Sequence, residues 1–195
     1  MKKVLLVSLL MLFSGLSSAF SQQDLIALLQ KSQNIQGGFT QQRFLKSLSK
    51  PIVSRGKFVL LANKGLLWQM QQPFAVDLRV KKDGIMQWNG SQWIANNKLG
   101  QSEQINLFLG LLSGDISALS AQFDLQLSGS PQQWRLTLTP SSLLMKQIFN
   151  HIIIKGDGLV REIELDEKQG DRTLILFSQV QTNQPLSAFA QSALH

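Results

Sequence analysis

The sequence predicts an α+β protein, mainly β, in which about eleven antiparallel strands form an incomplete barrel covered by short helices. Apolar and polar residues alternate with a period of two over most of residues 39–95 and again over 123–180. Helical spacing of apolar residues occurs near the start of the chain and in its middle. One sheet of so many twisted strands must curl, and its apolar concave face needs covering helices.

The first 19 residues have the pattern of a secretory signal peptide. Lys2 and Lys3 precede an apolar run over 4–13, and the small residues of 17–19 suit a signal peptidase. The alternative is a retained membrane anchor, but the run is shorter than the ~20 residues that span a bilayer. We expect cleavage after Ala19, a periplasmic location, and one domain over residues 20–195.

The first element of that domain is an amphipathic helix over 22–33, which the pair Gly37-Gly38 follows. Strands come next, and the alternation is clearest over 74–81, where Phe74, Val76, Leu78 and Val80 share one face. Turn signals separate the strands, among them Asp83-Gly84 and Asn89-Gly90.

The middle of the chain changes to helical spacing, which predicts a helix through residues 105–112 and a second short one over 116–119. The strand pattern then returns in five segments. These are residues 123–127, 134–139, 147–155, 159–165 and 173–180. Pro185 precedes a last short segment.

Residues with catalytic or metal-binding chemistry are few. The chain has no Cys and two His, of which His195 is the last residue and His151 lies in a predicted strand. Asp166 and Glu167 belong to a hairpin, where a solvated loop explains two acids better than a paired-carboxylate site does. We therefore predict a protein that is not an enzyme and has no metal and no cofactor.

The charge pattern argues against a nucleic-acid partner. Removing Lys2 and Lys3 with the leader lowers the net charge from +7 to +5. The remaining basic residues are scattered and form no stripe interleaved with aromatic residues. The excess charge suits a solvated basic face, or steering toward an anionic membrane or an acidic partner.

Large apolar side chains are the feature that points to a function. The chain has 11 Phe, 4 Trp and 5 Met. A curled sheet with a helical lid has more concave apolar surface than short helices fill, and such hollows bind apolar ligands. The residues that we expect to line the hollow are Phe44, Phe58, Trp68, Val76, Leu78 and Val80 from strands, and Ile105, Phe108, Leu109 and Leu112 from the lid.

Several of these segments, in this order, resemble the outer-membrane lipoprotein carrier family, LolA. The resemblance covers about residues 22–180, and its first motif is Phe39-Thr40-Gln41-Gln42 after the amphipathic helix. The other segments that carry it are residues 54–58, 65–73, 85–88, 134–140 and 152–164. The chain looks like a member of this family, or a divergent relative that carries another lipid or a lipid-linked pigment.

The resemblance implies a monomeric carrier with an apolar cavity for the acyl chains of lipoproteins or lipids. It implies an inner-membrane ABC transporter that supplies the cargo and an outer-membrane acceptor that takes it. In the family an arginine before the Trp-bearing strand helps to hold the lid, and the nearest basic residue here is Lys64. Two further hypotheses are a lipid-sensing interaction module on the same fold and a hydrolase that acts on lipids.

Overall fold

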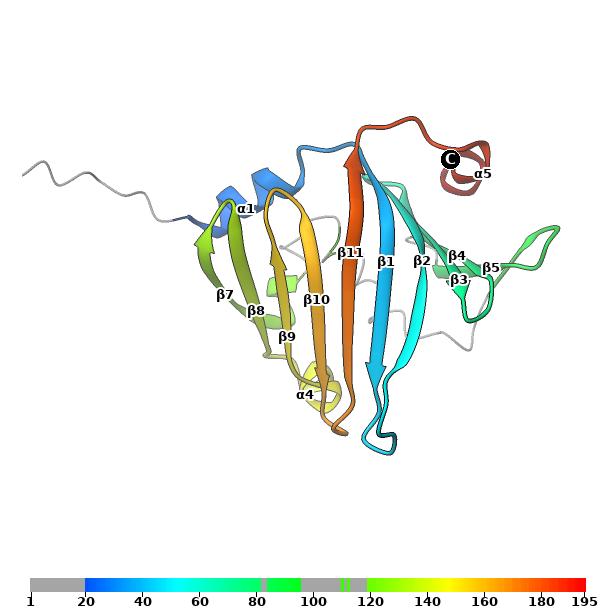
Figure 1. Ribbon diagram of the computed structural model, residues 1–195. Helices are drawn as coiled ribbons and strands as arrows, with labels where there is room; N and C mark the ends of the chain where they lie inside the picture. Colours follow the sequence, from blue (N-terminus) through cyan, green and yellow to red (C-terminus); the bar gives the residue numbers. More distant parts are fainter. Residues whose placement is uncertain (1–19, 82–83, 96–109, 111, 113–118) are drawn as a thin grey trace, which may run out of the picture.

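A single antiparallel sheet of eleven strands dominates the computed structural model, which describes residues 20–81, 84–95, 110, 112 and 119–195 (Figure 1). The strand order is β6-β5-β4-β3-β2-β1-β11-β10-β9-β8-β7. The first six strands are β1 (Asn34–Phe44), β2 (Ile52–Leu61), β3 (Gly65–Gln72), β4 (Val76–Lys81), β5 (Gly84–Trp88) and β6 (Trp93–Ala95). The others are β7 (Phe123–Ser130), β8 (Gln133–Pro140), β9 (Phe149–Gly156), β10 (Val160–Glu167) and β11 (Arg172–Thr182).

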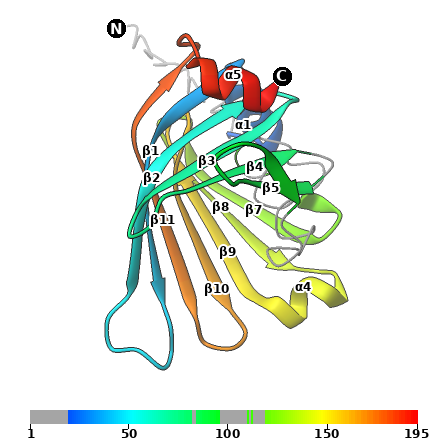
Figure 2. The same cartoon turned by 90° about the vertical axis from the view of Figure 1, so that its right-hand side faces the viewer.

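The sheet curls without closing, because β6 and β7 are its two ends in the strand order and do not pair with each other (Figure 2). The predicted incomplete antiparallel barrel with short helices is therefore confirmed. Long-range pairing of β1 with β11, for example Phe39 opposite Phe177, joins the two halves of the chain in the middle of the sheet. No helix among the described residues has both the length and the apolar character that crossing a membrane requires.

Helix α1 (Gln22–Leu29) packs on the main core, with Leu25 and Leu29 buried. Its N-terminus has a capping box, in which the Ser21 side chain accepts a hydrogen bond from the Asp24 backbone N–H and the Asp24 carboxylate accepts one from the Ser21 backbone N–H. Hydrogen bonds from the Ser21 hydroxyl and backbone N–H lower the pKa of Asp24. The helix ends at Leu29, before the predicted limit at residue 33, and β1 begins at Asn34 and runs through Gly37 and Gly38.

A second helix, α4 (Leu143–Ile148), lies at the end of the sheet opposite α1, between β8 and β9 (Figure 2). Here the prediction of a strand beginning at Gln147 was wrong by two residues, and the helix itself was not expected. The Ser142 side chain caps α4 by accepting a hydrogen bond from the Met145 N–H, and Met145 is its buried residue.

The third described helix, α5 (Ala188–Leu194), packs on the outer face of the sheet. Ala190, Ala193 and Leu194 are buried against Val59 of β2 and Leu67 of β3. Near α5, Trp88, Trp93 and Phe189 form an aromatic cluster in which Arg79 lies over the Trp93 ring. The C-terminal segment thus forms a second, smaller core, on the side of the sheet away from the main one.

Candidate functional site

The concave face of the sheet is lined by buried or partly buried apolar side chains of β1 to β5 and β7 to β11, because residues of one parity on these strands point toward it. Its centre is an aromatic cluster from four adjacent strands, namely Phe39 of β1, Phe58 of β2, Trp68 of β3 and Phe177 of β11. The rings of Phe39 and Trp68 are stacked with their centroids 3.6 Å apart, and Phe58 meets Phe177 edge to face at 5.0 Å. Aromatic contacts such as the edge-to-face pair of Phe58 and Phe177 stabilise the cluster beyond the burial of its area.

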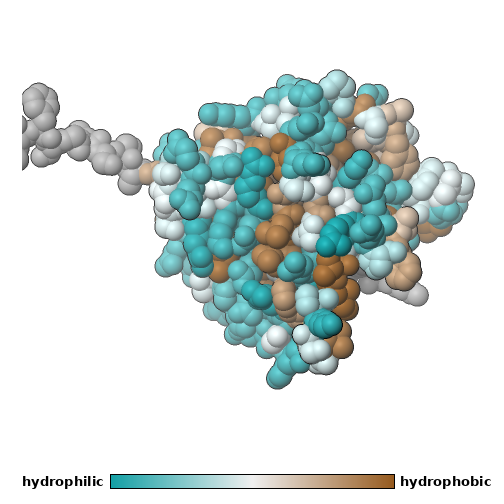
Figure 3. Space-filling view, in the orientation of Figure 1, coloured by the Kyte–Doolittle hydropathy of each residue, from teal (hydrophilic) through white to brown (hydrophobic). Residues whose placement is uncertain are grey.

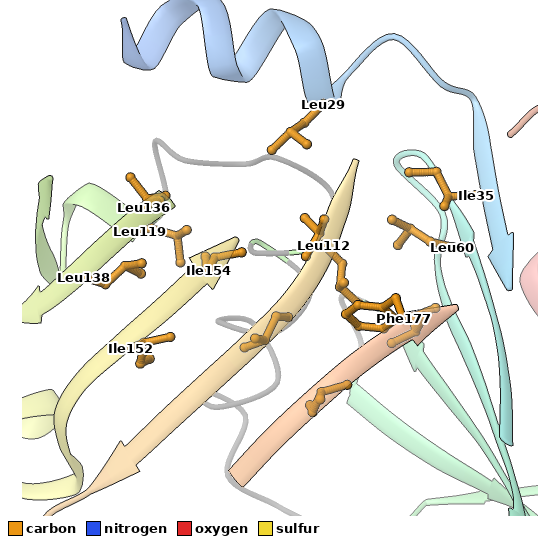
Figure 4. Packing of buried hydrophobic residues seen from close by; sticks show 14 of the residues in the cluster. Leu29, Ile35, Leu60, Leu112, Leu119, Leu136, Leu138, Ile152, Ile154 and Phe177 are labelled. Atoms are coloured by element: carbon orange, nitrogen blue, oxygen red, sulfur yellow. The ribbon is translucent and has the colours of Figure 1, made fainter. Parts of the chain in front are cut away.

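The other half of the concave face carries mainly aliphatic side chains, together with Phe123 of β7 and Trp134 of β8. Leu136 and Leu138 of β8 and Ile152 and Ile154 of β9 are all buried. Figure 4 shows Leu112 between this aliphatic half and the half that holds Leu60 and Phe177. Leu112 is only 4 % exposed, so the chain itself supplies an apolar side chain to the middle of the interior.

The structure places the sequence-predicted strand residues as follows. Phe58, Trp68 and Val80 are buried in the main core, and Leu78 is half-buried against it. Val76 has the same parity as Leu78 and Val80 on β4 and is also half-buried. These five residues therefore lie on the expected face.

Phe44 is the exception. It lies five positions after Phe39 on β1, which puts it on the opposite, outer face, where it pairs with Arg172. The Arg172 guanidinium lies over its ring at 4.3 Å from the centroid. Phe44 therefore does not line the hollow, contrary to our expectation. Counting residues in steps of two along β1 from Phe39 would have placed Phe44 on the outer face.

Three of the predicted lid residues, Ile105, Phe108 and Leu109, lie outside the described residues. Leu112 is described and is buried in the main core. Lys64 is exposed in the turn between β2 and β3, where its backbone N–H donates to the Leu61 carbonyl oxygen. The lid that Lys64 was expected to contact falls within the residues that are not described.

Sequence reasoning did not select Phe39 and Phe177, although both belong to the centre of the site. Phe177 shares its parity with Thr173 and Ile175 on β11, so alternation alone could have put it on an apolar face. Its contact with the aromatic residues of β1 and β2 depends on the pairing of β1 with β11, which joins residues far apart in the chain.

The charged groups lie mainly on the outer face, where they pair with one another. Lys155 contacts Glu162 at 2.7 Å and Arg172 contacts Glu164 at 3.2 Å. His151 lies 3.4 Å from Asp166, and both side chains are about a third exposed. Within the described part of the chain, no three His, Asp or Glu side chains gather into a possible metal site.

A pocket of about 690 Å³, with both polar and apolar lining residues, lies over the paired ends of β7 to β10 and reaches Leu176 and Phe177 of β11. Ion pairs occupy much of its wall, including Lys155 with Glu162 and Arg161 with Asp157 at 2.9 Å. Burial raises the pKa of Asp157, but the hydrogen bonds from Arg161 and the Leu159 N–H, with the charge of Arg161, outweigh it and lower the pKa below its usual value. The Trp134 indole N–H donates to the Asp157 carbonyl oxygen, which ties this turn to the concave core.

Comparison with known proteins decides the family. The sequence model of the family of the outer membrane lipoprotein carrier protein LolA matches residues 30–190 of this chain. The chain belongs to the LolA family. The LolA family consists of carriers, so binding and transport, not catalysis, are the class of function.

Curated relatives carry the same description. Two outer-membrane lipoprotein carrier proteins of Pseudomonas putida, from strains KT2440 and GB-1, are each 28 % identical over 190 residues, which is 93 % of this chain and 88 % of theirs.

Among solved structures, a LolA superfamily protein of Nitrosomonas europaea matches with a TM-score of 0.47 and 9 % identity, over 85 % of this chain and 95 % of that one. The MucA/MucB complex of Pseudomonas aeruginosa matches with a TM-score of 0.49 and 15 % identity, over 85 % of this chain and 57 % of that one.

Proposed function

We propose that this protein is a periplasmic carrier that binds the acyl chains of lipoproteins on its concave face and shuttles them from the inner to the outer membrane. In this proposal the leader is removed near Ala19, an inner-membrane transporter supplies the cargo, and an outer-membrane acceptor receives it. The observation that supports it best is a concave face lined by buried apolar side chains across the sheet, in a member of a lipoprotein carrier family.

The energetics explain why a carrier needs such a face. Each exposed CH₂ group costs ~0.8 kcal/mol in water, so an acyl chain of ~16 carbons costs ~13 kcal/mol to bring out of a bilayer. The aromatic cluster around Trp68 and the aliphatic side chains around Ile152 offer an apolar surface that offsets this cost. The ion pairs of the outer face, such as Lys155 with Glu162 and Arg172 with Glu164, offer an acyl chain nothing comparable.

Leu112 indicates how cargo would enter. Its side chain occupies the interior between the two halves of the concave face (Figure 4), where an acyl chain would have to lie. In our proposal cargo displaces the Leu112 side chain, and the return of this side chain helps to expel the cargo at the acceptor. Binding and release are then two states of one apolar interior.

A matched pair of leucines tests the acyl-binding face. Leu78 is half-buried on the concave face and Leu174 is half-buried on the outer face, so Leu78→Asp and Leu174→Asp make the same change on opposite sides. We expect Leu78→Asp to reduce the acyl-bearing cargo that co-purifies with the exported protein by about tenfold or more, because a carboxylate is costly beside a buried acyl chain.

The measurement is mass spectrometry of the lipid extracted per mole of folded protein, with circular dichroism to verify folding. Leu174→Asp serves as the control and should keep its load. Equal loading of the two variants would contradict the proposal. If the extract holds a lipid other than a lipoprotein, that lipid is the cargo and lipoprotein is not.

A further inference from the structure

One end of the sheet forms a continuous rim that carries exposed leucines and lysines. Its three parts are α4, the β10–β11 turn (168–171) and the β1–β2 loop (45–51), which Figures 1 and 2 show at the end opposite α1 and α5. Hydrogen bonds join the parts. The Lys168 N–H donates to the Ile148 carbonyl oxygen at 2.9 Å, and the Lys46 N–H donates to the Asp171 carboxylate at 3.0 Å.

Large apolar side chains are unusually exposed on this rim. Leu143 and Leu144 of α4 are 82 % and 40 % exposed, and Leu48 and Ile52 at the β1–β2 loop are about half exposed. The outer face between the rim and α5 is a mixed surface, hydrophilic at its sides with a hydrophobic band over its middle strands (Figure 3). Elsewhere exposed apolar side chains lie singly, as Phe74 (75 %) and Ile94 (46 %) do, whereas the rim brings four of them together. Exposed leucines from separate segments of one rim indicate a surface that meets an apolar phase.

The charges of the same rim are mainly positive. Lys46, Lys50, Lys146 and Lys168 are all exposed. The carboxylate of Asp171 is half-buried, accepts the Lys46 N–H and lies 3.8 Å from the Arg43 guanidinium, so it is already occupied. Lysines beside exposed leucines are the chemistry that binds an anionic lipid surface, because the leucines enter the interface while the ammonium groups reach the headgroups.

We propose that this rim docks the protein on the surface of an anionic membrane, with Leu143 and Leu144 inserted at the level of the headgroups. The rim is separate from the concave core, so the proposal does not depend on which cargo the protein carries. A docked carrier would be held at the membrane surface, where cargo leaves or enters the bilayer, and would dissociate easily because few side chains insert.

The test measures binding of the exported, cargo-free protein to vesicles. We expect co-sedimentation with vesicles of phosphatidylcholine and phosphatidylglycerol, weaker binding as salt increases, and much weaker binding to phosphatidylcholine alone. Leu143→Asp should lower the affinity by about tenfold, since it removes an inserting leucine and adds a repelled charge. Lys50→Glu should lower it by about tenfold or more at low salt. Leu176→Asp is the matched control, because Leu176 is 37 % exposed on the outer face, away from the rim.

Because the chain has no cysteine, a single Leu143→Cys variant can carry an environment-sensitive fluorophore. Its emission should shift to the blue on the anionic vesicles, whereas the same label at Leu176→Cys should not shift. Absence of vesicle binding, equal effects of Leu143→Asp and Leu176→Asp, or an unshifted label at Leu143 would overturn the proposal. If the rim binds a protein partner instead of a membrane, the label at Leu143 stays unshifted on the vesicles. None of these outcomes affects the loading measured with Leu78→Asp, so the two proposals fail separately.

Discussion

Replacing Phe39 by alanine tests whether the concave face of the cargo-free protein is a packed core or an open hollow. Phe39 is 2 % exposed, and its ring stacks on Trp68 with 3.6 Å between the ring centroids. In a packed core the loss of a phenylalanine ring leaves a cavity and costs about 3–5 kcal/mol, of which about 1 kcal/mol comes from the lost aromatic contact. We expect a fall of about 4 kcal/mol in the free energy of unfolding, or about 12 °C in Tm for a domain of this size.

The assay is urea unfolding of delipidated protein followed by circular dichroism, with Phe189→Ala as the control. Phe189 is half-buried on the outer face against Trp88 and Trp93, so its truncation should cost about half as much. A loss below about 1.5 kcal/mol for Phe39→Ala, or one equal to that of Phe189→Ala, would refute a packed interior. It would instead indicate a preformed hollow in which the ring has few neighbours.

Two further predictions concern the sheet and its outer face. Gly56→Ala should destabilise the protein by about 3 kcal/mol in the same urea assay, because a Cβ at Gly56 collides with the backbone of β3. In the control Gly158→Ala the new Cβ meets open space, so the stability should change little. Similar losses of stability in the two variants would contradict the close approach of β2 to β3 at Gly56. Asp157→Asn should lower the Tm at neutral pH, where the carboxylate holds Arg161. Since the folded pKa of Asp157 is depressed, this stabilisation is present above the usual pKa of 3.8 and is lost as the pH falls through the folded value. A difference in Tm between the wild type and Asp157→Asn that persists at the lowest pH would exclude this ion pair as its source.

Local patterns predicted most of the sheet. The alternation over residues 74–81 put Val76, Leu78 and Val80 on one face, and the register of β3 with β4 and of β4 with β5 agrees with it. β4 and β5, which flank the turn signal predicted at residues 82–84, do pair as a hairpin, and Asn89-Gly90 lies between β5 and β6, which also pair. These predictions succeeded because a strand alternates its side chains with a fixed period and a short hairpin needs only neighbouring residues.

The site was less predictable. Phe44 lies on the outer face because only the register of β1 with its neighbours fixes which parity points inward. Phe177 reaches Phe58 through pairing between strands from opposite ends of the chain, and this pairing leaves no local signal. The helix α4 was not predicted because its six residues are too short a window for helical periodicity, and its last two residues were assigned to the following strand.

The sequence by itself determined that this is a mainly β protein with one apolar face along its strands and a resemblance to lipoprotein carriers, because these properties follow from local periodicity and from the order of short motifs. The tertiary structure alone decided that β1 and β11 join the two halves, that α5 packs on the outer face over β2 and β3, and that three distant segments form one rim of leucines and lysines. These features depend on long-range strand pairing and packing, which bring together residues whose separation in the chain hides their contact.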